Sequence, residues 1–251
     1  MKDLKIWYDW AYRDGEEAAS LTELRGLFQE HDNLLFFDTE TTGFAAHGRD
    51  RITELAAVQI GRDGIIIREE DVFIQLPEGL TIPPQITQLT GITDAMCRSG
   101  ITEAEAMERF LLMITSRTLI IAYNAQFDLN FIAQMCIRQK KTITADFLDP
   151  MTIFKDRRTF PHKLSDAIEA YELEEKVRNS HRAIDDVYAL VEVTKAMALE
   201  RDDLNGYVNL FGYNPKYGIS GKRLKTIRYC EQPYHDGMCE PEETLPAISR
   251  A

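Results

Sequence analysis

The sequence predicts an α/β fold in which helices flank a mixed five-stranded sheet, with a three-strand meander followed by a β-α-β arrangement. Short continuous apolar runs, typical of buried strands, are first separated by turn signals and later alternate with segments of helical periodicity. Of the 251 residues, 44% are hydrophobic and 28% are charged, which is enough apolar material for a sizeable core.

Five strands are predicted from these runs. The first is the apolar run at residues 34–37, which leads directly into Asp38 and Glu40. Residues 52–60 form the second strand, a turn signal follows at 62–64, and residues 65–76 form the third. Short connections of this kind predict an antiparallel meander. The fourth and fifth strands are predicted at residues 119–122 and 147–149.

Helices are predicted where apolar residues recur at helical spacing. A short helix at residues 85–90 ends at Gly91, Thr102 caps a helix over 103–115, and a helix over 129–138 follows the fourth strand. Three later helices are predicted. The first begins at Pro150, the second spans residues 163–171, and the third begins after a Ser180 cap and carries the long apolar stripe at 183–194.

Three regions of different composition are expected. Residues 1–32 form an N-terminal extension with four early aromatic residues and a helix over 16–30, which we expect to pack on the main domain rather than to bind a partner. Residues 33–200 form that main domain. Residues 201–251 form a C-terminal extension whose final proline-containing stretch we expect to be poorly ordered.

The C-terminal extension contains a basic segment. Residues 213–230 hold five basic residues and no acidic one, interleaved with tyrosines, and a strand-like stretch is predicted at 223–229. Such a segment suits contact with a nucleic-acid backbone or stacking on bases, and a solvated edge hairpin explains it equally well.

Composition excludes several classes of protein. The net charge of −12 argues against nucleic-acid binding through bulk electrostatics, but not against an enzyme that meets phosphates through cations held by its carboxylates. No apolar run is long enough for a membrane span and no signal peptide is recognisable. Four scattered cysteines indicate free thiols and a cytoplasmic location, and Cys230, His235 and Cys239 lack a fourth ligand for zinc.

Several acidic residues lie at predicted strand ends and helix starts, where the sheets of α/β proteins bind ligands. Asp38 and Glu40 are two residues apart on a strand, so their side chains point to the same face. Asp128 follows the fourth strand, and Asp186 lies in the long helix five residues after His181. Together these groups would hold two divalent cations, Mg²⁺ or Mn²⁺, about 4 Å apart, an arrangement suited to displacement at phosphorus. Taken alone, Asp38 and Glu40 are more typical of a strand that ends in polar residues than of a metal site.

Three segments make a resemblance specific. Residues 38–43 (DTETTG), 124–128 (NAQFD) and 181–186 (HRAIDD) resemble, in order and separation, the three motifs of the DEDDh exonuclease family. Residues 89–93 (LTGIT) resemble a further segment shared in that family. The resemblance covers about residues 33–200 and includes the proofreading epsilon subunit of bacterial DNA polymerase III and the exonuclease domain of polymerase C.

The resemblance implies a ribonuclease H-like fold and metal-dependent 3′→5′ hydrolysis that releases nucleoside monophosphates. Asp38, Glu40, Asp128 and Asp186 match the metal-binding acids, and His181 matches the general base, a role that suits an imidazole near neutral pH. The family spacing of five residues after the histidine selects Asp186 over Asp185, which we expect to be a solvated neighbour.

The same resemblance also assigns residues that contact the substrate. Thr41, Phe44 and Asn124 match positions that contact the terminal nucleotide. Tyr123 stands where many family members have histidine, which predicts altered substrate contacts but no loss of a metal ligand.

The sequence therefore predicts a 3′→5′ exonuclease that acts on single-stranded DNA or frayed 3′ ends in proofreading or repair, either with a DNA polymerase or alone. One alternative is an RNA-trimming exoribonuclease of the same family. Another is a noncatalytic interaction subunit, against which the intact acids and histidine argue. Discrimination between DNA and RNA depends on contacts to the 2′ position, which the sequence does not reveal.

Overall fold

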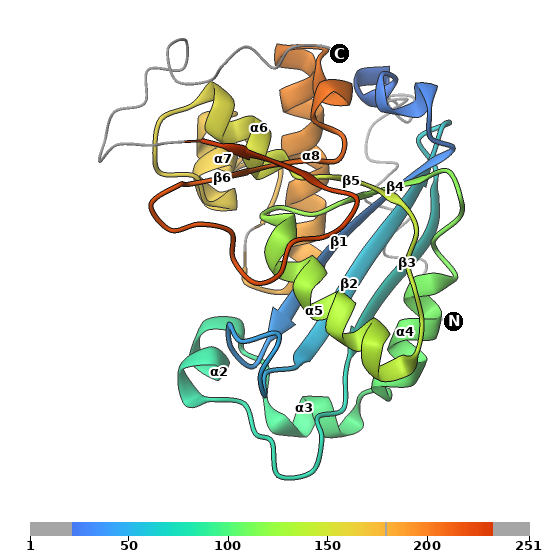
Figure 1. Ribbon diagram of the computed structural model, residues 1–251, viewed down its shortest axis with the longest axis vertical. Coiled ribbons are helices and arrows are strands. Elements are labelled where there is room, and N and C mark those ends of the chain that lie inside the picture. The colour runs from blue at the N-terminus through green and yellow to red at the C-terminus, as the bar shows by residue number, and fades with distance from the viewer. Residues whose placement is uncertain (1–21, 179, 233–251) are drawn as a thin grey trace.

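The structure, a computed structural model, describes residues 22–178 and 180–232. Its centre is a five-stranded sheet in the order β3-β2-β1-β4-β5 (Figure 1). The strands are β1 (Asn33–Thr41), β2 (Ile52–Gly61), β3 (Ile66–Phe73), β4 (Thr118–Ile121) and β5 (Asp146–Leu148). β1, β2 and β3 pair antiparallel, whereas β4 pairs parallel with β1 and with β5. The predicted mixed sheet and its meander are confirmed.

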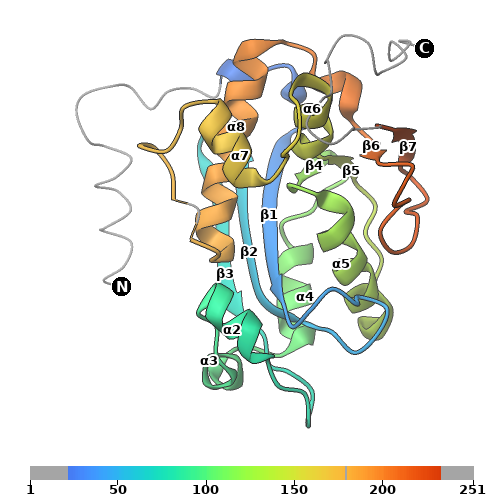
Figure 2. The same cartoon turned by 90° about the vertical axis from the view of Figure 1, so that its left-hand side faces the viewer.

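Helices cover both faces of the sheet (Figure 2). One face packs against α4 and α5, and the other packs against α6, α7 and α8. The helices are α2 (Pro84–Thr90), α3 (Asp94–Ser99), α4 (Glu103–Leu111), α5 (Ala125–Gln139), α6 (Pro150–Arg157), α7 (Leu164–Ala170) and α8 (Ala183–Glu200). Among the described residues, no helix is long and apolar enough to cross a membrane.

The side chains of β1 alternate between two cores. Leu34 and Phe36 pack in the cluster under α8, and Leu35 and Phe37 pack in the cluster under α4 and α5. Because the strand period is two, Asp38 continues the row that faces α8. The alternation of side chains along β1 therefore determines from which face of the sheet the acidic side chains project.

Helix starts differ from the prediction by more than one residue at two places. α5 begins at Ala125, four residues before the predicted start, so Asp128 lies inside its first turn; the left-handed backbone of Asn124 (φ 59°) makes the turn that allows this. α8 begins after Arg182, and Ser180 does not cap it. The Ser180 hydroxyl instead donates a hydrogen bond to the carboxylate of Asp185. The short helix α3, which Thr93 caps, was not predicted.

The described part of the N-terminal extension packs on the core but does not form the expected continuous helix. It forms two 3₁₀ turns, η1 (Thr22–Leu24) and η2 (Leu27–Gln29), whose apolar side chains are buried under α8. Gly26 lies between them, and its carbonyl accepts hydrogen bonds from the Gln29 N–H (3.2 Å) and from the side chain of Asn205 (2.7 Å). Residues 16–21, the early aromatic residues and the final stretch after residue 232 lie outside the described residues.

The start of the C-terminal extension packs on the same body. It comprises η3 (Leu204–Tyr207) and a two-stranded parallel sheet of β6 (Leu210–Tyr213) and β7 (Arg228–Glu231). Of the strand predicted at residues 223–229, only the last two residues are in β7. The residues before them turn instead of extending, and the Ile227 N–H donates to the carbonyl of Leu224 (3.3 Å) across this turn. Cys97, Cys136 and Cys230 are free thiols, as expected.

Replacement of Phe36 by alanine should lower the free energy of unfolding by about 3–5 kcal/mol, because this fully buried ring fills the core between β1 and α8. Urea unfolding followed by circular dichroism measures the change. Leu199→Ala is the matched control, since Leu199 is 71% exposed and its loss should change the free energy by less than about 0.5 kcal/mol. Equal effects at both positions would contradict the assigned core.

Candidate active site

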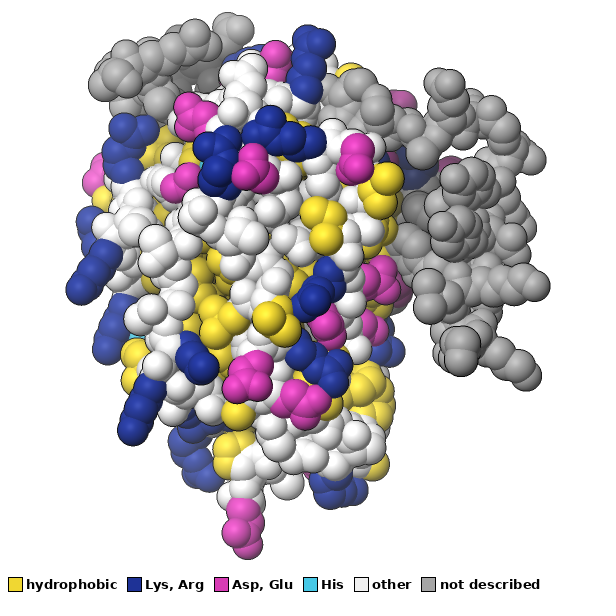
Figure 3. All heavy atoms as spheres, turned by 90° about the vertical axis from the view of Figure 1, so that its right-hand side faces the viewer, with side chains coloured by type: hydrophobic (Ala, Val, Ile, Leu, Met, Phe, Trp, Pro, Cys, Tyr) yellow, Lys and Arg dark blue, Asp and Glu magenta, His cyan; other side chains and the backbone are white. Residues whose placement is uncertain are grey.

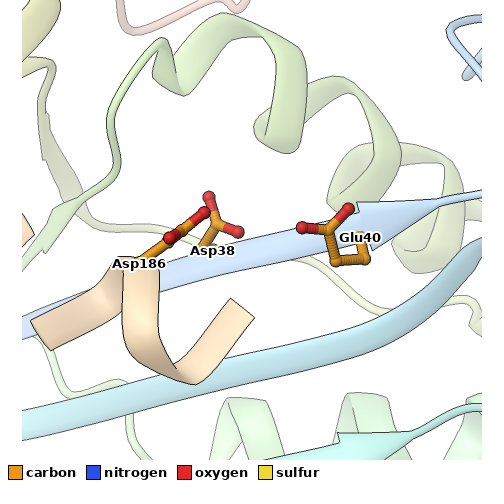
Figure 4. Close-up of side chains that lie close together, drawn as sticks. All are labelled: Asp38, Glu40 and Asp186. Atoms are coloured by element: carbon orange, nitrogen blue, oxygen red, sulfur yellow. The ribbon is translucent and has the colours of Figure 1, made fainter. Parts of the chain in front are cut away.

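Three carboxylates converge between β1 and α8 (Figure 4). Asp38 and Glu40 rise from the same face of β1, and Asp186 projects toward them from the first turn of α8. One ligand oxygen of each residue lies within 4.8 Å of those of the other two. The strand period aligns the first two acids, and the packing of α8 across β1 brings the third to them.

Burial and mutual repulsion dominate the electrostatics of this cluster. Burial, followed by the charge of Glu54, raises the pKa of Asp38 to about 7. Burial, followed by the charge of Asp38, raises the pKa of Glu40 to about 9 and that of Asp186 to about 8. Without a counter-charge the three carboxyl groups therefore retain protons near neutral pH, and a bound cation would favour their ionised forms.

The donor set suits a hard divalent cation. The Asp186 Oδ1 atom is buried and has no hydrogen-bond partner among the described residues. Such an oxygen is costly to bury unless something binds it. Three carboxylates with an unpartnered oxygen match the oxygen ligands that Mg²⁺ and Mn²⁺ prefer. Asp38, Glu40 and Asp186 are therefore the described residues that would hold a metal ion.

Asp128 approaches β1 from the opposite side. Thr39, whose side chain faces α5, donates to the Asp128 Oδ1 atom from its hydroxyl (2.5 Å) and from its backbone N–H (3.2 Å). Burial, followed by the charge of Asp38, raises the pKa of Asp128 well above its usual value. Asp128 is thus electrostatically coupled to the cluster but does not belong to the group of three within 4.8 Å.

His181 lies outside the three-carboxylate cluster. Its side chain is exposed, two residues before the start of α8, and its backbone is left-handed (φ 57°). Asp185 is half-buried and accepts a hydrogen bond from Ser180, whereas Asp186 points to β1. The two adjacent acids of α8 therefore face different surroundings.

The residues assigned to substrate contact occupy three kinds of environment. Thr41 is buried and its hydroxyl donates to the carbonyl of Gly43 (2.7 Å), so this hydroxyl stabilises the turn after β1. Phe44 is 87% exposed, with its ring 6.2 Å from that of Phe127. Asn124 is exposed, and its backbone N–H donates to Asp149.

Tyr123 is buried next to the strand end. Its hydroxyl donates to the carbonyl of His162 (3.1 Å). At this position the tyrosine therefore holds the segment before α7, and its side chain is not presented at the surface.

Sequence reasoning missed Glu54, which fixes the start of α8. Glu54 lies on β2 and is completely buried. Its Oε1 atom accepts hydrogen bonds from both Nε (3.0 Å) and the terminal nitrogen (2.6 Å) of Arg182, and its Oε2 atom accepts from the backbone N–H of Ala183 (3.0 Å). The signal for this role was a lone acidic residue inside the predicted strand at residues 52–60.

Comparisons with known proteins agree with this geometry. A family profile described as exonuclease (RNase_T) matches residues 35–194, a segment that contains all the acids discussed above. The chain belongs to this exonuclease family. It is 31% identical to DNA polymerase III subunit epsilon of Treponema pallidum, over 72% of this chain and 84% of that protein. The DEDD-type resemblance read from the motifs is therefore confirmed.

Two further comparisons set the extent of the likeness. This chain is 32% identical to DNA polymerase III PolC-type of Clostridium perfringens. The match extends over 65% of this chain but only 11% of that much longer protein. A crystal structure of E. coli exonuclease I in complex with a dA16 oligonucleotide superposes with a TM-score of 0.61 at 22% identity, covering 70% of this chain and 42% of that one. This likeness confirms the ribonuclease H-like exonuclease fold.

Replacement of Arg182 by alanine should lower the free energy of unfolding by about 3 kcal/mol, because it leaves the buried Glu54 carboxylate without its charged partner. Urea unfolding measures the change. The control is Arg178→Ala, since Arg178 is exposed and forms no ion pair among the described residues. A loss no larger than that of the control would show that the Glu54–Arg182 pair does not stabilise α8.

The protein in EDTA should become less stable as the pH rises from about 5 to about 9. Folding raises the pKa values of Asp38, Glu40 and Asp186 from 3.8 or 4.5 to about 7–9, so the folded chain binds protons that the unfolded chain releases, and stability falls with pH in this window. Excess Mg²⁺ should reduce this loss because it binds the ionised groups.

Melting temperatures at pH 6 and pH 9, with EDTA or Mg²⁺, measure the effect. The Asp38→Asn/Asp186→Asn double variant is the control and should show a smaller dependence on both pH and Mg²⁺. Identical pH profiles for the wild type and this variant would contradict the electrostatic account.

Proposed function

We propose that this chain is a divalent-cation-dependent 3′→5′ exonuclease that releases nucleoside monophosphates from the 3′ end of single-stranded DNA. The observation that carries the proposal is the convergence of Asp38, Glu40 and Asp186, with an unpartnered buried oxygen, in a member of the exonuclease family. Repelling carboxylates held together in this way suit cation binding beside a phosphodiester.

Asp38, Glu40 and Asp186, with Asp128 beside them, would hold two Mg²⁺ or Mn²⁺ ions. When bound, these ions supply charge neutralisation at the scissile phosphate and make water a better nucleophile. Thr39 holds Asp128 in place through its hydroxyl and N–H. The Glu54–Arg182 pair holds the first turn of α8 and thereby the position of Asp186.

His181 is the proposed general base. It precedes α8 by two residues, on the segment that Arg182 ties to Glu54, and its ring is exposed to solvent. An exposed imidazole accepts a proton from the attacking water and passes it to solvent. Catalytic hydrogen bonds often tighten only when substrate is bound, so the open position of His181 is consistent with this role.

The terminal nucleotide is proposed to lie against Phe44. A phenylalanine that is 87% exposed beside the ring of Phe127 presents a face on which a base can stack. Thr41 and Asn124 complete the proposed contacts, with Thr41 acting through the turn that it stabilises. Single-stranded DNA is the preferred substrate in this proposal because the structural relative exonuclease I was crystallised with an oligodeoxynucleotide.

The likeness to polymerase III epsilon and PolC-type proteins favours a more specific role, the editing of 3′ ends made by a polymerase. A mismatched primer end frays and becomes single-stranded, so the same site would remove it. Faster hydrolysis of a mismatched than of a matched primer–template end is the expected result, and equal rates would argue against editing.

Replacement of Asp186 by asparagine should lower kcat by about 10³-fold or more, because it removes a negatively charged ligand from the cation site. The assay follows a 5′-labelled single-stranded oligodeoxynucleotide with Mg²⁺ or Mn²⁺ on a sequencing gel. A ladder that shortens from the 3′ end and the release of mononucleotides establish the polarity and the product, and EDTA should abolish both.

Asp185→Asn is the matched control, since it makes the same chemical change one residue away, on a side chain bonded to Ser180. It should retain activity within a few fold. Equal losses at the two positions, or no loss at Asp186, would overturn the site. A parallel assay on RNA of the same sequence tests the substrate: faster hydrolysis of RNA would replace DNA in the proposal.

A further inference from the structure

The loop that joins β6 to β7, residues 214–227, carries a concentration of positive charge. Together with Arg228 it holds five basic residues and no acidic residue, although the whole chain has a net charge of −12. All five side chains are exposed: Lys216, Lys222, Arg223, Lys225 and Arg228. None of them takes part in an ion pair among the described residues.

This distribution differs from that on another face of the molecule. On the face shown in Figure 3, Lys and Arg side chains are interspersed with Asp and Glu side chains over much of the surface. In the β6–β7 loop, Lys216 and Arg223 instead lie over the rings of Tyr217 and Tyr229, at 5.2 and 5.1 Å from the ring centroids. Among the described residues, neither of these two side chains forms an ion pair with a carboxylate, and each contacts an aromatic ring instead.

The loop is fixed to α5. The side-chain amide of Gln126 donates to the carbonyls of Ser220 (2.9 Å) and Lys222 (2.8 Å), and the Lys222 N–H donates to Asn130 Oδ1 (3.0 Å). Gln126 and Asn130 are both buried. A long loop held by buried side chains, with its cations directed to solvent, is a structured surface.

The same attachment places the loop beside the proposed nucleotide contact. Gln126 and Asn130 flank Asp128 along α5. A hollow of about 190 Å³ separates the turn after β1 from the β6–β7 loop, and its lining includes Phe44, Phe127, Asn130 and Gly221. Figure 2 shows the turn after β1 and the β6–β7 loop on the same side of the molecule, next to α5.

Gly221 allows the close approach. Its backbone is left-handed (φ +71°), and a Cβ atom there would lie 2.6 Å from the Asn130 side chain. The glycine thus lets the loop contact α5 and form one wall of the hollow.

We propose that the β6–β7 loop binds the phosphate backbone of the single strand a few nucleotides 5′ of the end that is cleaved. The proposal rests on the proposed exonuclease function and extends it to the path of the substrate. A strand whose terminal base stacks on Phe44 would cross the aromatic hollow and reach Lys222, Arg223 and Lys225. Because the rest of the protein is acidic and repels nucleic acid, binding requires a local basic surface of this kind.

The test is the Lys222→Ala/Arg223→Ala/Lys225→Ala triple variant, which leaves the backbone bonds to α5 intact. Its KM for dT12 should rise roughly tenfold, with little change in kcat and a smaller rise in the KM for dT3, because dT3 has too few phosphates to contact all three cations. The slope of log KM against log salt for dT12 should flatten by about 2, since each lost phosphate contact on a single strand removes about 0.7.

The matched control is Arg25→Ala/Arg68→Ala/Lys141→Ala, which removes the same charge from two exposed positions and one half-buried position elsewhere. It should leave the KM for dT12 within about twofold, and equal melting temperatures of the two variants show that both fold. A rise in KM that is the same for dT3 and dT12, or the same in the control, would overturn the proposal. An unchanged KM for dT12 would also overturn it.

Binding measured without hydrolysis separates this proposal from the proposed function. Fluorescence anisotropy of labelled dT12 and rU12 in EDTA should show weaker binding of both strands to the loop variant, because phosphate contacts do not distinguish the sugars. If the wild type hydrolyses no nucleic acid but this loss is present, the proposed function fails and the loop proposal stands. If the wild type hydrolyses nucleic acid but the loop variant and the control variant bind the labelled strands equally well, the loop proposal fails and the proposed function stands.

Discussion

Repulsion between carboxylates is the constraint on which the organisation of this protein depends. Asp38, Glu40 and Asp186 have oxygens within 4.8 Å of one another, and burial raises the pKa of each. A chain gains nothing in stability from such an arrangement, so the surrounding contacts must hold it in place. The cost is understandable if the acids serve a cation, and the unpartnered Asp186 Oδ1 atom is consistent with that use.

The contacts that hold the acids come from both faces of the sheet. On the α8 face, the buried Glu54 binds Arg182 and the Ala183 N–H and so fixes the helix turn that carries Asp186. On the α5 face, Thr39 binds Asp128. Because consecutive residues of β1 point to opposite faces, one strand connects the two layers through Asp38 and Thr39. β1 is the central strand of the sheet and is hydrogen-bonded to β2 on one side and to β4 on the other.

The C-terminal extension adds a basic surface to an acidic protein. Gln126 and Asn130, buried on α5, hold the β6–β7 loop next to the turn that carries Phe44. The family match ends at residue 194, so this loop lies outside the part of the chain that defines the family. Exonuclease chemistry and substrate path can therefore reside in different segments of the same chain.

The sequence by itself determined the mixed sheet, the place of each of its five strands in the chain, and the family. Apolar runs identify buried strands, and the two-residue spacing of Asp38 and Glu40 places them on one face, because both signals are local. Contacts between distant segments were decided only by the tertiary structure. Examples are the pairing of Glu54 with Arg182, the attachment of Asp128 to Thr39 rather than to the cluster of three, and the burial of Tyr123 against His162. Local pattern does not encode which side chains meet across 39 to 128 positions of chain, because that depends on how the layers pack.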